Sequence, residues 1–547
     1  MARRKKRGIR RLPSNVVLNQ NILPQVYLNR SRFNISEGLK TTINVGDLVP
    51  VYWEEMSPGD QFNFNVNGLF RLTTPIVPIM DNLRVKLYSF FVPNRLLWSH
   101  WENFMGEQEK DGSTKDYIVP LINVGQAKEM SLSDYLGVPL NVGSSVSSLQ
   151  VSALPYRAYL KIWNEWFRSE FLQKEHIFSD GDETVSITDT TDTNYSGYKL
   201  FDSLLKKGKN FDYFTSALPF PQVGEPVSIP LIGDAPIKSS GSFVTKSALG
   251  CYDNDGLKGY FSPGTAEGPD IIYGNTDNST GSLNKTNLLY ADMSNVSGAT
   301  IEDLRNAFMI QRILEKDAQG GVRYIEQIRS HWHVVNPDYR LQRSHFLGSK
   351  SIPVTINPIA QTSATSQDST PQANLSAVGV GGMRQHLFNY GATEHGILMV
   401  LACLDGDVSY QQGLPKKFSK RMRFDYMFPE LANLGEQPIL NKEIFAQGTA
   451  EDNKVFGYTE RYRELKQGFS KVTGKFRSTA TQSLDIWHLA EKFNNLPTLS
   501  DEFIKVSLPL DRVLAVPNEP DLLCDFWFDI SALRCLPVRA NPGNMRL

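Results

Sequence analysis

The 547-residue sequence is poor in cysteine, with only Cys251, Cys403, Cys524 and Cys535 and no CxxC pair. This scatter predicts neither a zinc ribbon nor the disulfide framework of a small secreted domain. A chain of this length can bury a large core without such cross-links. We therefore expect reduced thiols and assembly inside a cell.

Long hydrophobic runs are also missing. The most apolar run, Ile397 to Leu404, is much shorter than the roughly 20 residues that a membrane-spanning helix needs. The basic amino terminus is not continued by the apolar segment of a signal peptide, because Pro13, Asn15 and Asn19 interrupt the next residues. The sequence therefore predicts neither a membrane anchor nor a signal peptide.

Catalytic motifs are the third absence. The chain has no GxSxG elbow, P-loop or HExxH, and the glycines of Gly379–Gly382 lack the spacing of a dinucleotide site. His331 and His333 would share a face of an extended segment, but beyond His345 nothing supplies a third metal ligand, so we interpret them as structural. We predict no enzymatic activity, no metal and no cofactor.

Charge is balanced overall but unevenly placed. The net charge is −1, yet residues 1–11 carry seven Lys and Arg residues, which leaves −8 on the rest of the chain. Such a segment has nothing apolar to bury and repels itself, so residues 1–30 are interpreted as a basic arm followed by an extended segment. We expect the arm to bind nucleic acid, although a solubilising tail or a localisation signal has the same composition.

A later cluster mixes basic residues with the rings of Phe418, Phe424 and Tyr426. This mixture suits single-stranded nucleic acid, and a solvated surface is an equally good interpretation. The candidate nucleic-acid-binding residues are therefore Arg3, Arg4, Lys5, Lys6, Arg7, Arg10, Arg11, Lys416, Lys417, Lys420, Arg421 and Arg423.

Apolar residues alternate along several segments, as they do in β-strands. In Gln61–Leu72, Phe62, Phe64, Val66, Phe70 and Leu72 share one parity and predict a half-buried strand. Leu83–Val92 is apolar on both parities and should be covered on both sides. Later strands are predicted at Ile397–Leu404, Val472–Arg477, Phe503–Leu510 and Cys524–Ile530, the last followed by a bulge near Leu533 and Cys535.

Helices and one long polar excursion separate these strands. Helices are predicted at 94–105, at 152–172 and from Thr300 to Gly320, the last with a capping-box-like start. The densest run of polar turn residues, at about 233–297, is interpreted as an insertion in a domain covering 31–547. Strands at both ends of the chain imply non-local pairing, which a Greek-key barrel or jelly roll provides.

The sequence resembles the major capsid proteins of the Microviridae, most closely those of gokushovirus-like small single-stranded DNA bacteriophages. The matching motifs run in family order from about residue 30 to 490. They include Gly38–Thr42, Leu48–Val51, Thr74–Asn82, Phe90–Leu96, Asp212–Pro219, Leu304–Phe308, Gly320–Tyr324, Arg340–Arg343, Thr473–Arg477 and Trp487–His488.

The resemblance implies a mainly β protein, an eight-stranded antiparallel jelly-roll barrel with long loop insertions and a few helices. Such subunits self-assemble into a T=1 icosahedral shell around a circular single-stranded DNA genome. The implied partners are other copies of the chain, the genome, a small internal DNA-binding protein, a DNA pilot protein and a host surface receptor, which the insertion would meet as a surface protrusion. The implied location is the virion, assembled in the bacterial cytoplasm.

Two other classes fit the composition. A β-sandwich carbohydrate-binding or adhesion protein would also carry exposed aromatics and polar loops. A β-fold glycoside hydrolase would need two carboxylates facing each other across a cleft, which spacing in the sequence cannot test.

Overall fold

The computed structural model describes residues 30–107, 116–124, 127–140, 149–186, 203–224, 237–239, 249–253, 256–261, 271–272, 289–291, 301–321, 324–332, 342–363 and 372–539. The chain divides into two compact units. The first comprises Met1–Pro221 and Gly321–Leu547, and the second comprises Gln222–Gly320.

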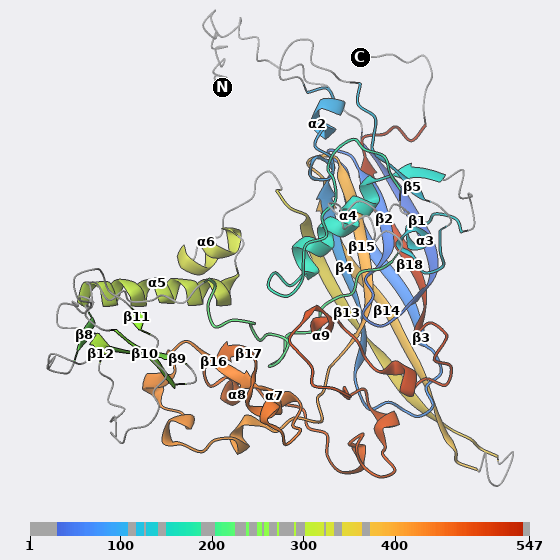
Figure 1. Cartoon of the computed structure of the whole chain (residues 1–547). Coiled ribbons are helices and arrows are strands. Elements are labelled where there is room, and N and C mark those ends of the chain that lie inside the picture. The colour runs from blue at the N-terminus through green and yellow to red at the C-terminus, as the bar shows by residue number, and fades with distance from the viewer. Residues whose placement is uncertain are drawn as a thin grey trace, which may run out of the picture. The chain divides into compact units, whose positions relative to one another are not determined.

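An eight-stranded antiparallel sheet forms the centre of the first unit (Figure 1). The strands lie in the order β1-β18-β3-β14-β13-β4-β15-β2, so neighbours in space are mostly distant in sequence. This order, in a sheet curled around one core, is that of the predicted jelly-roll barrel. The bounds are β1 Ser31–Ile43, β2 Val49–Met56, β3 Gln61–Leu72, β4 Leu83–Pro93, β13 His345–Ala360, β14 Leu375–Gly391, β15 Gly396–Gly406 and β18 Leu522–Arg534.

The barrel interior is filled by the apolar parity of each strand. In β3, Phe62, Phe64, Val66, Phe70 and Leu72 are all buried, as the alternation predicts. Their rings meet those of neighbouring strands: Phe70 meets Phe526 edge-on at 5.3 Å, and Phe64 stacks on Phe388 at 5.1 Å. One face of every strand therefore supplies the core.

Strands β4 and β15 are buried on both faces, which confirms the prediction for Leu83–Val92. In β15, Leu398, Val400 and Leu404 point into the barrel, whereas Ile397, Met399 and Leu401 belong to a second core outside it. Helix α4 (Leu154–Ile162) supplies much of that second core and lies across these strands (Figure 1). This half of the barrel is therefore covered by a second layer.

Helix α4 has the local signals expected of it. Pro155 occupies the first turn, and every residue of the helix except Lys161 is buried, including Tyr156, Tyr159 and Leu160. The helix continues as a π-helical turn, Trp163–Phe167. The Tyr159 hydroxyl donates to the Leu48 carbonyl at 2.8 Å and accepts from the Leu205 amide at 2.9 Å, which fixes the helix to two loops.

Strand β13 joins the two halves of the barrel and does not show in the apolar pattern. Its first part, His345–Val354, pairs with β4, and its second part, Thr355–Ala360, pairs with β14. The second part is largely exposed, so its residues do not alternate between apolar and polar.

The glycine at position 379 lies in strand β14 and not in a nucleotide-binding loop. A Cβ added at Gly379 would come within 2.7 Å of Leu72, so close packing of the strands explains the glycine there.

Four local predictions are wrong. Val472–Arg477 is a loop with a 3₁₀ turn, Gly474–Phe476. Phe503–Leu510 starts in the last residues of the short helix α9 (Asp501–Ile504) and continues as a loop. The β18 ladder runs without a bulge, because Leu533 takes the outer face while Ala532 fills the core. The segment 94–105 forms two short pieces, a 3₁₀ turn at Asn94–Leu96 and α2 (Trp101–Phe104), instead of one helix.

Smaller elements occupy the loops of the first unit. The short strands are β5 Leu121–Val124, β6 Leu149–Ser152, β7 Val185–Ser186, β16 Glu436–Leu440 and β17 Val455–Glu460. The remaining helices are α3 Leu132–Tyr135, α6 Tyr324–Trp332, α7 Asn441–Ile444 and α8 Arg463–Lys466. Because α6 is helical up to Trp332, His331 does not lie in an extended segment; His333 lies outside the described residues.

The second unit holds the 20-residue helix α5, Ile301–Gly320, which confirms the third predicted helix. Its strands are β8 Ile237–Ser239, β9 Leu249–Asp253, β10 Gly256–Phe261, β11 Ile271–Ile272 and β12 Leu289–Ala291. The unit contains the range 233–297 that the sequence marks as an insertion. Its role as a surface protrusion stays a prediction.

Lys206, Lys207 and Lys209 each lie within 4.0 Å of a carboxylate. Lys207 Nζ lies 3.1 Å from Asp405 Oδ2, and Lys86 Nζ lies 2.6 Å from the same oxygen. Lys209 pairs with Glu491 at 2.5 Å, and Lys206 with Asp47 at 3.8 Å. Burial alone would raise the pKa of Asp405, but the two ammonium groups hold it below its ordinary value.

We expect Asp405→Asn to destabilise the protein by about 3–5 kcal/mol at pH 7, because two largely buried ammonium groups lose their counter-charge. Since the pKa of Asp405 is lowered by folding, its contribution is complete above the ordinary value of 3.8 and is lost as the pH falls. Denaturation of wild type and variant across pH should show the gap closing toward acid. The control is Asp407→Asn, which loses only the exposed pair with Arg84 and should cost less than about 1 kcal/mol. Equal effects of the two variants would contradict the prediction.

Candidate nucleic-acid interface

The predicted cluster of basic residues and rings lies in an irregular segment after β15, which we call the aromatic–basic segment (residues 414–434). It contains three 3₁₀ turns, Lys416–Phe418, Arg423–Asp425 and Pro429–Leu431. The amides of Arg421 and Met422 both donate to Asp425 Oδ2 at 2.8 Å, which lowers the pKa of that carboxyl. These two hydrogen bonds define the turn at Arg421–Asp425.

Two of the five basic side chains in this segment are engaged within the fold. Lys416 lies 3.8 Å from the buried carboxylate of Glu443 and donates to the Pro438 carbonyl at 3.0 Å. Lys420 lies 3.6 Å from Glu464, whose side chain is also buried. Burial raises the pKa of Glu443, and Lys416 opposes that shift. These two lysines therefore form ion pairs within the fold.

The other three basic residues, Lys417, Arg421 and Arg423, are exposed. Arg423 lies over the rings of Phe424 and Phe428, and Lys417 lies over Phe418. These cation–π contacts keep the charges at the surface beside exposed rings. A base could stack on such a ring while its phosphate meets the cation.

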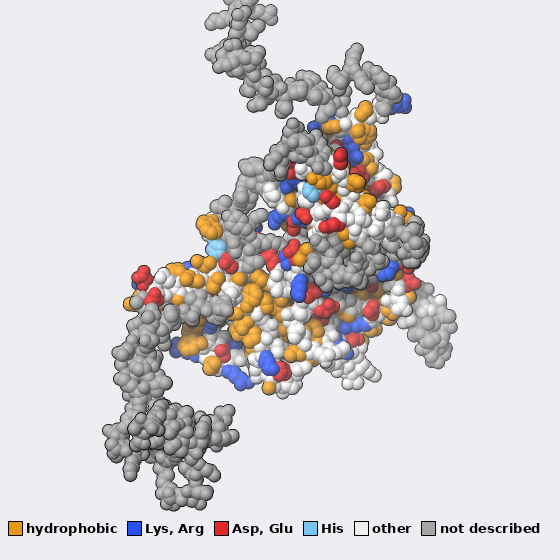
Figure 2. Space-filling view, turned by 45° about the horizontal axis from the view of Figure 1, so that its top comes forward, with side chains coloured by type: hydrophobic (Ala, Val, Ile, Leu, Met, Phe, Trp, Pro, Cys, Tyr) orange, Lys and Arg blue, Asp and Glu red, His pale blue; other side chains and the backbone are white. Residues whose placement is uncertain are grey.

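Large apolar side chains are exposed throughout the same segment. They are Phe418, Met422, Phe424, Tyr426, Met427 and Leu434, each more than half exposed. On the face drawn in Figure 2, hydrophobic side chains likewise reach the surface beside Lys and Arg. An exposed apolar cluster of this size is typical of an interaction site, for nucleic acid or for another protein.

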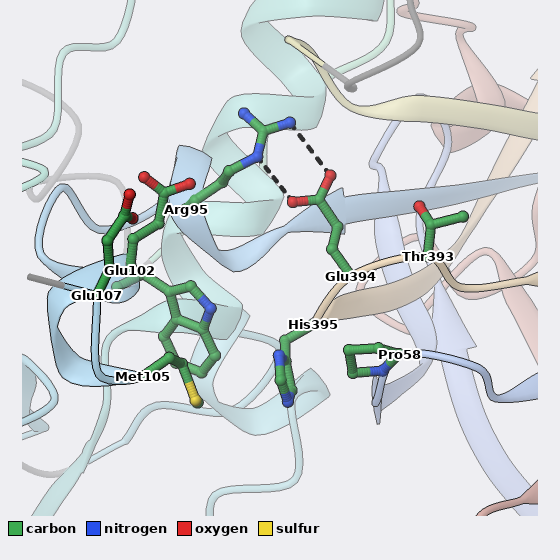
Figure 3. A pocket seen from close by; sticks show the side chains of 9 residues that line it. Pro58, Arg95, Glu102, Met105, Glu107, Thr393, Glu394 and His395 are labelled. Carbon is green, nitrogen blue, oxygen red and sulfur yellow. Dashed lines mark hydrogen bonds and ion pairs between the residues drawn. The ribbon is translucent and has the colours of Figure 1, made fainter. Parts of the chain in front are cut away.

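A separate pocket of about 500 Å³ lies where the loops after β4 and before β15 meet (Figure 3). Arg95 reaches across it and binds Glu394 through two hydrogen bonds, of 2.7 and 3.1 Å. Trp101, Glu102, Met105, Glu107 and His395 complete much of its wall. The bidentate pair ties the two loops together, and we interpret it as structural.

The residues that the structure describes offer little support for catalytic or metal-binding chemistry. Those residues include no group of three or more His, Cys, Asp or Glu that could hold a metal ion. Burial raises the pKa of the free thiols of Cys403 and Cys524 to about 12, so both stay protonated and inert. Among the described helices, none combines the length and apolar character of a membrane span.

Comparison with known proteins decides the class. A phage family described as "Capsid protein (F protein)" matches residues 22–544. The chain belongs to this capsid protein family. Capsid protein VP1 of Bdellovibrio phage phiMH2K is 40% identical over 95% of this chain and 96% of its own length. The VP1 proteins of Chlamydia phage 1 (38%; 98% and 99%) and Spiroplasma virus 4 (34%; 95% and 96%) match over similar spans.

Family membership confirms the resemblance to major capsid proteins of Microviridae-like phages and the jelly-roll expectation. A capsid protein has a structural role in the virion. The seven basic residues between Arg3 and Arg11 lie outside the described residues, so their role stays a prediction. Among the five in the aromatic–basic segment, the structure separates three exposed side chains from two that are held by carboxylates.

One exposed tryptophan is not singled out in the sequence prediction. Trp527 is among the tryptophans expected in the core or a subunit interface, with stacking on unpaired bases as the alternative for a few of them, and it is 51% exposed on the outer face of β18. The signal was present, because Phe526 and Phe528 share the core parity and Trp527 lies on the other.

The two kinds of basic residue should respond differently to substitution. We expect the triple variant Lys417→Ala, Arg421→Ala, Arg423→Ala to weaken binding of a dT oligonucleotide and to reduce its salt slope by about 2, at a stability change within about 0.5 kcal/mol. The pair Lys416→Met, Lys420→Met should instead lower stability by about 1–3 kcal/mol, because buried carboxylates lose their cations. Salt-dependent anisotropy and thermal unfolding measure both. If the triple variant leaves oligonucleotide binding intact but blocks assembly, the segment is a subunit contact instead.

Proposed function

We propose that this chain is the major capsid protein of a small single-stranded DNA bacteriophage and assembles into a T=1 icosahedral shell around a circular genome. The observation that carries the proposal is the match to capsid proteins over nearly the whole chain, on a jelly-roll barrel. The barrel supplies a rigid subunit, and exposed apolar side chains on its loops supply area that other copies can cover. On this proposal the protein has no catalytic activity.

The genome is held electrostatically in this scheme. The arm carries seven positive charges within eleven residues, and the exposed Lys417, Arg421 and Arg423 add a second basic surface. Phosphate neutralisation gives sequence-independent affinity, which is what packaging an arbitrary genome requires. A small internal DNA-binding protein and a DNA pilot protein are further proposed partners, with assembly in the bacterial cytoplasm.

Particle formation and the arm can be tested together. We expect the purified full-length protein to give uniform shells by negative-stain microscopy and light scattering, and shells formed in infected cells to contain DNA. Deleting residues 2–11 should spare the shell but lower its DNA content. For oligonucleotide binding, the deletion should reduce the salt slope by up to about 5, since seven contacts contribute about 0.7 each. A monomeric protein would contradict the capsid assignment, and unchanged DNA content would contradict the role of the arm.

We further propose that the insertion at about 233–297 forms a surface protrusion that meets a host receptor. Its support is that it belongs to a compact unit distinct from the barrel unit. Replacing residues 240–290 by a short linker should still give particles, because the barrel strands are untouched, but should reduce their adsorption to host cells. Particle yield and adsorption are the two measurements. Failure to assemble would show instead that the segment is a core element.

A further inference from the structure

The outer face of the four strands β1, β18, β3 and β14 is bare. On the other half of the barrel, helix α4 and its neighbours cover β4 and β15, but along β18 every second side chain from Leu523 to Asp529 is exposed. On the same face, β1 exposes every second residue from Arg32 to Lys40, and β3 exposes Gln61, Asn63, Leu69 and Arg71 while Asn65 and Asn67 are partly exposed. This outer face of the barrel therefore has side-chain surface available for binding.

One row across this face places a tryptophan among polar groups. The register sets Gly38 of β1 beside Trp527 of β18, Trp527 beside Asn67 of β3, and Asn67 beside Arg384 of β14. A Cβ added at Gly38 would lie 3.3 Å from Trp527 Cε3, so the ring lies over the glycine. Within the described part of the chain the indole N–H makes no hydrogen bond, which leaves a ring and a donor accessible together.

The nearby residues on this face carry amides, a hydroxyl and, two positions along β18 on either side of Trp527, the carboxylates of Asp525 and Asp529. In the next row, Asn65 Oδ1 lies 3.0 Å from His386 Nδ1, and Ser36 Oγ donates to Asp529 at 3.2 Å. The row beyond holds Asn63, to which Asn65 also donates. Amides both donate and accept, so they can meet the varied edges of unpaired bases.

The charges on this face favour a polyanion. The outer parity carries Arg32, Lys40, Arg71 and Arg384 against Asp525 and Asp529. Lys40 lies 4.0 Å from Asp525, but Arg71 and Arg384 make no ion pair among the described residues. Arg384 is two strands from Trp527, roughly 10 Å at the usual strand spacing, so one nucleotide could stack on the ring while a neighbouring phosphate meets the guanidinium.

The path of the chain points to the same occupant. Strand β1, an edge strand of this face, begins at Ser31, and the basic arm precedes it by about 20 residues. An extended linker of that length spans up to about 65 Å, so whatever the arm binds can also reach this face.

We propose that this face, centred on Trp527, binds unpaired bases of single-stranded nucleic acid, with the ring as a stacking platform and Arg71 and Arg384 as phosphate contacts. This rests on the proposed genome-enclosing function and assigns it a second, base-dependent component. The arm should bind any phosphate backbone, whereas Trp527 should respond only to strands that carry bases.

The test compares the full-length wild type with Trp527→Ala and Trp527→Phe for binding to labelled dT and abasic oligonucleotides of equal length. We expect Trp527→Ala to weaken dT binding about five-fold or more and to leave abasic binding unchanged. Trp527→Phe should retain most of the affinity. The matched control is Trp332→Ala, an exposed tryptophan at the end of α6, which should change neither.

A second measurement needs no variant. Ultraviolet crosslinking of wild-type particles whose DNA contains 5-bromodeoxyuridine should label the peptide that includes Trp527. Unchanged dT affinity in Trp527→Ala, or crosslinks that avoid β18, would overturn the inference while leaving the arm and the capsid proposal intact. Loss of particles with unchanged oligonucleotide affinity would make the face a subunit contact and also overturn it. Particles without DNA, and protein that binds neither strand, would instead reject the genome-enclosing function.

Discussion

The pairing of β18 between β1 and β3 is the constraint on which the rest of the structure depends. It joins residues near position 530 to two strands that lie within the first 72 residues of the chain, and the ladder continues without a break from Ser31–Arg534 to Ile43–Leu522. Every other strand of the barrel lies between these partners in sequence. Closing so long a loop costs chain entropy before any contact rewards it, so we expect this pairing to form slowly. The dense ring packing of Phe526 and Phe528 against β2 and β3 is the compensating term.

The long connections follow from this arrangement. Because the strands are fixed by their partners, the segments between them can grow without altering the core. The connection between β15 and β18 holds the aromatic–basic segment, and the one between β4 and β13 holds α4, the second unit and α6. Lys86, Lys207 and Asp405 show how one such connection is anchored, since a carboxylate on β15 holds a lysine of the barrel and a lysine of the loop together.

The sequence predicted strands with a clear apolar pattern, either on one face (β3 and β18) or on both (β4 and β15), and missed β13, whose pattern changes along its length. Gln61–Leu72 and Cys524–Ile530 alternate because one face is core and the other solvent. Strand β13 changes partner at Thr355 and leaves its second part exposed, so no single periodicity describes it. Conversely, Phe503 to Leu510 is apolar because Val506, Leu508 and Leu510 reach the barrel core from a loop, while Phe503 and Ile504 of α9 belong to a separate apolar cluster. Pattern alone cannot separate such a segment from a strand. In the aromatic–basic segment, the residue types were readable, but the carboxylates that hold Lys416 and Lys420 lie 27 and 44 residues away and were not.

Charges along one edge strand of the sheet oppose its pairing with a neighbouring chain. Strand β1 ends the sheet order on one side, and an uncharged edge would offer its backbone to a neighbouring chain. It instead carries Arg32, Glu37 and Lys40, all exposed, along its length. Charges at these positions disfavour strand-to-strand addition at this edge, so we expect subunits to meet there through loops and exposed side chains. Contacts made by side chains can be weak individually and still specific in geometry, and a closed symmetric shell needs both properties.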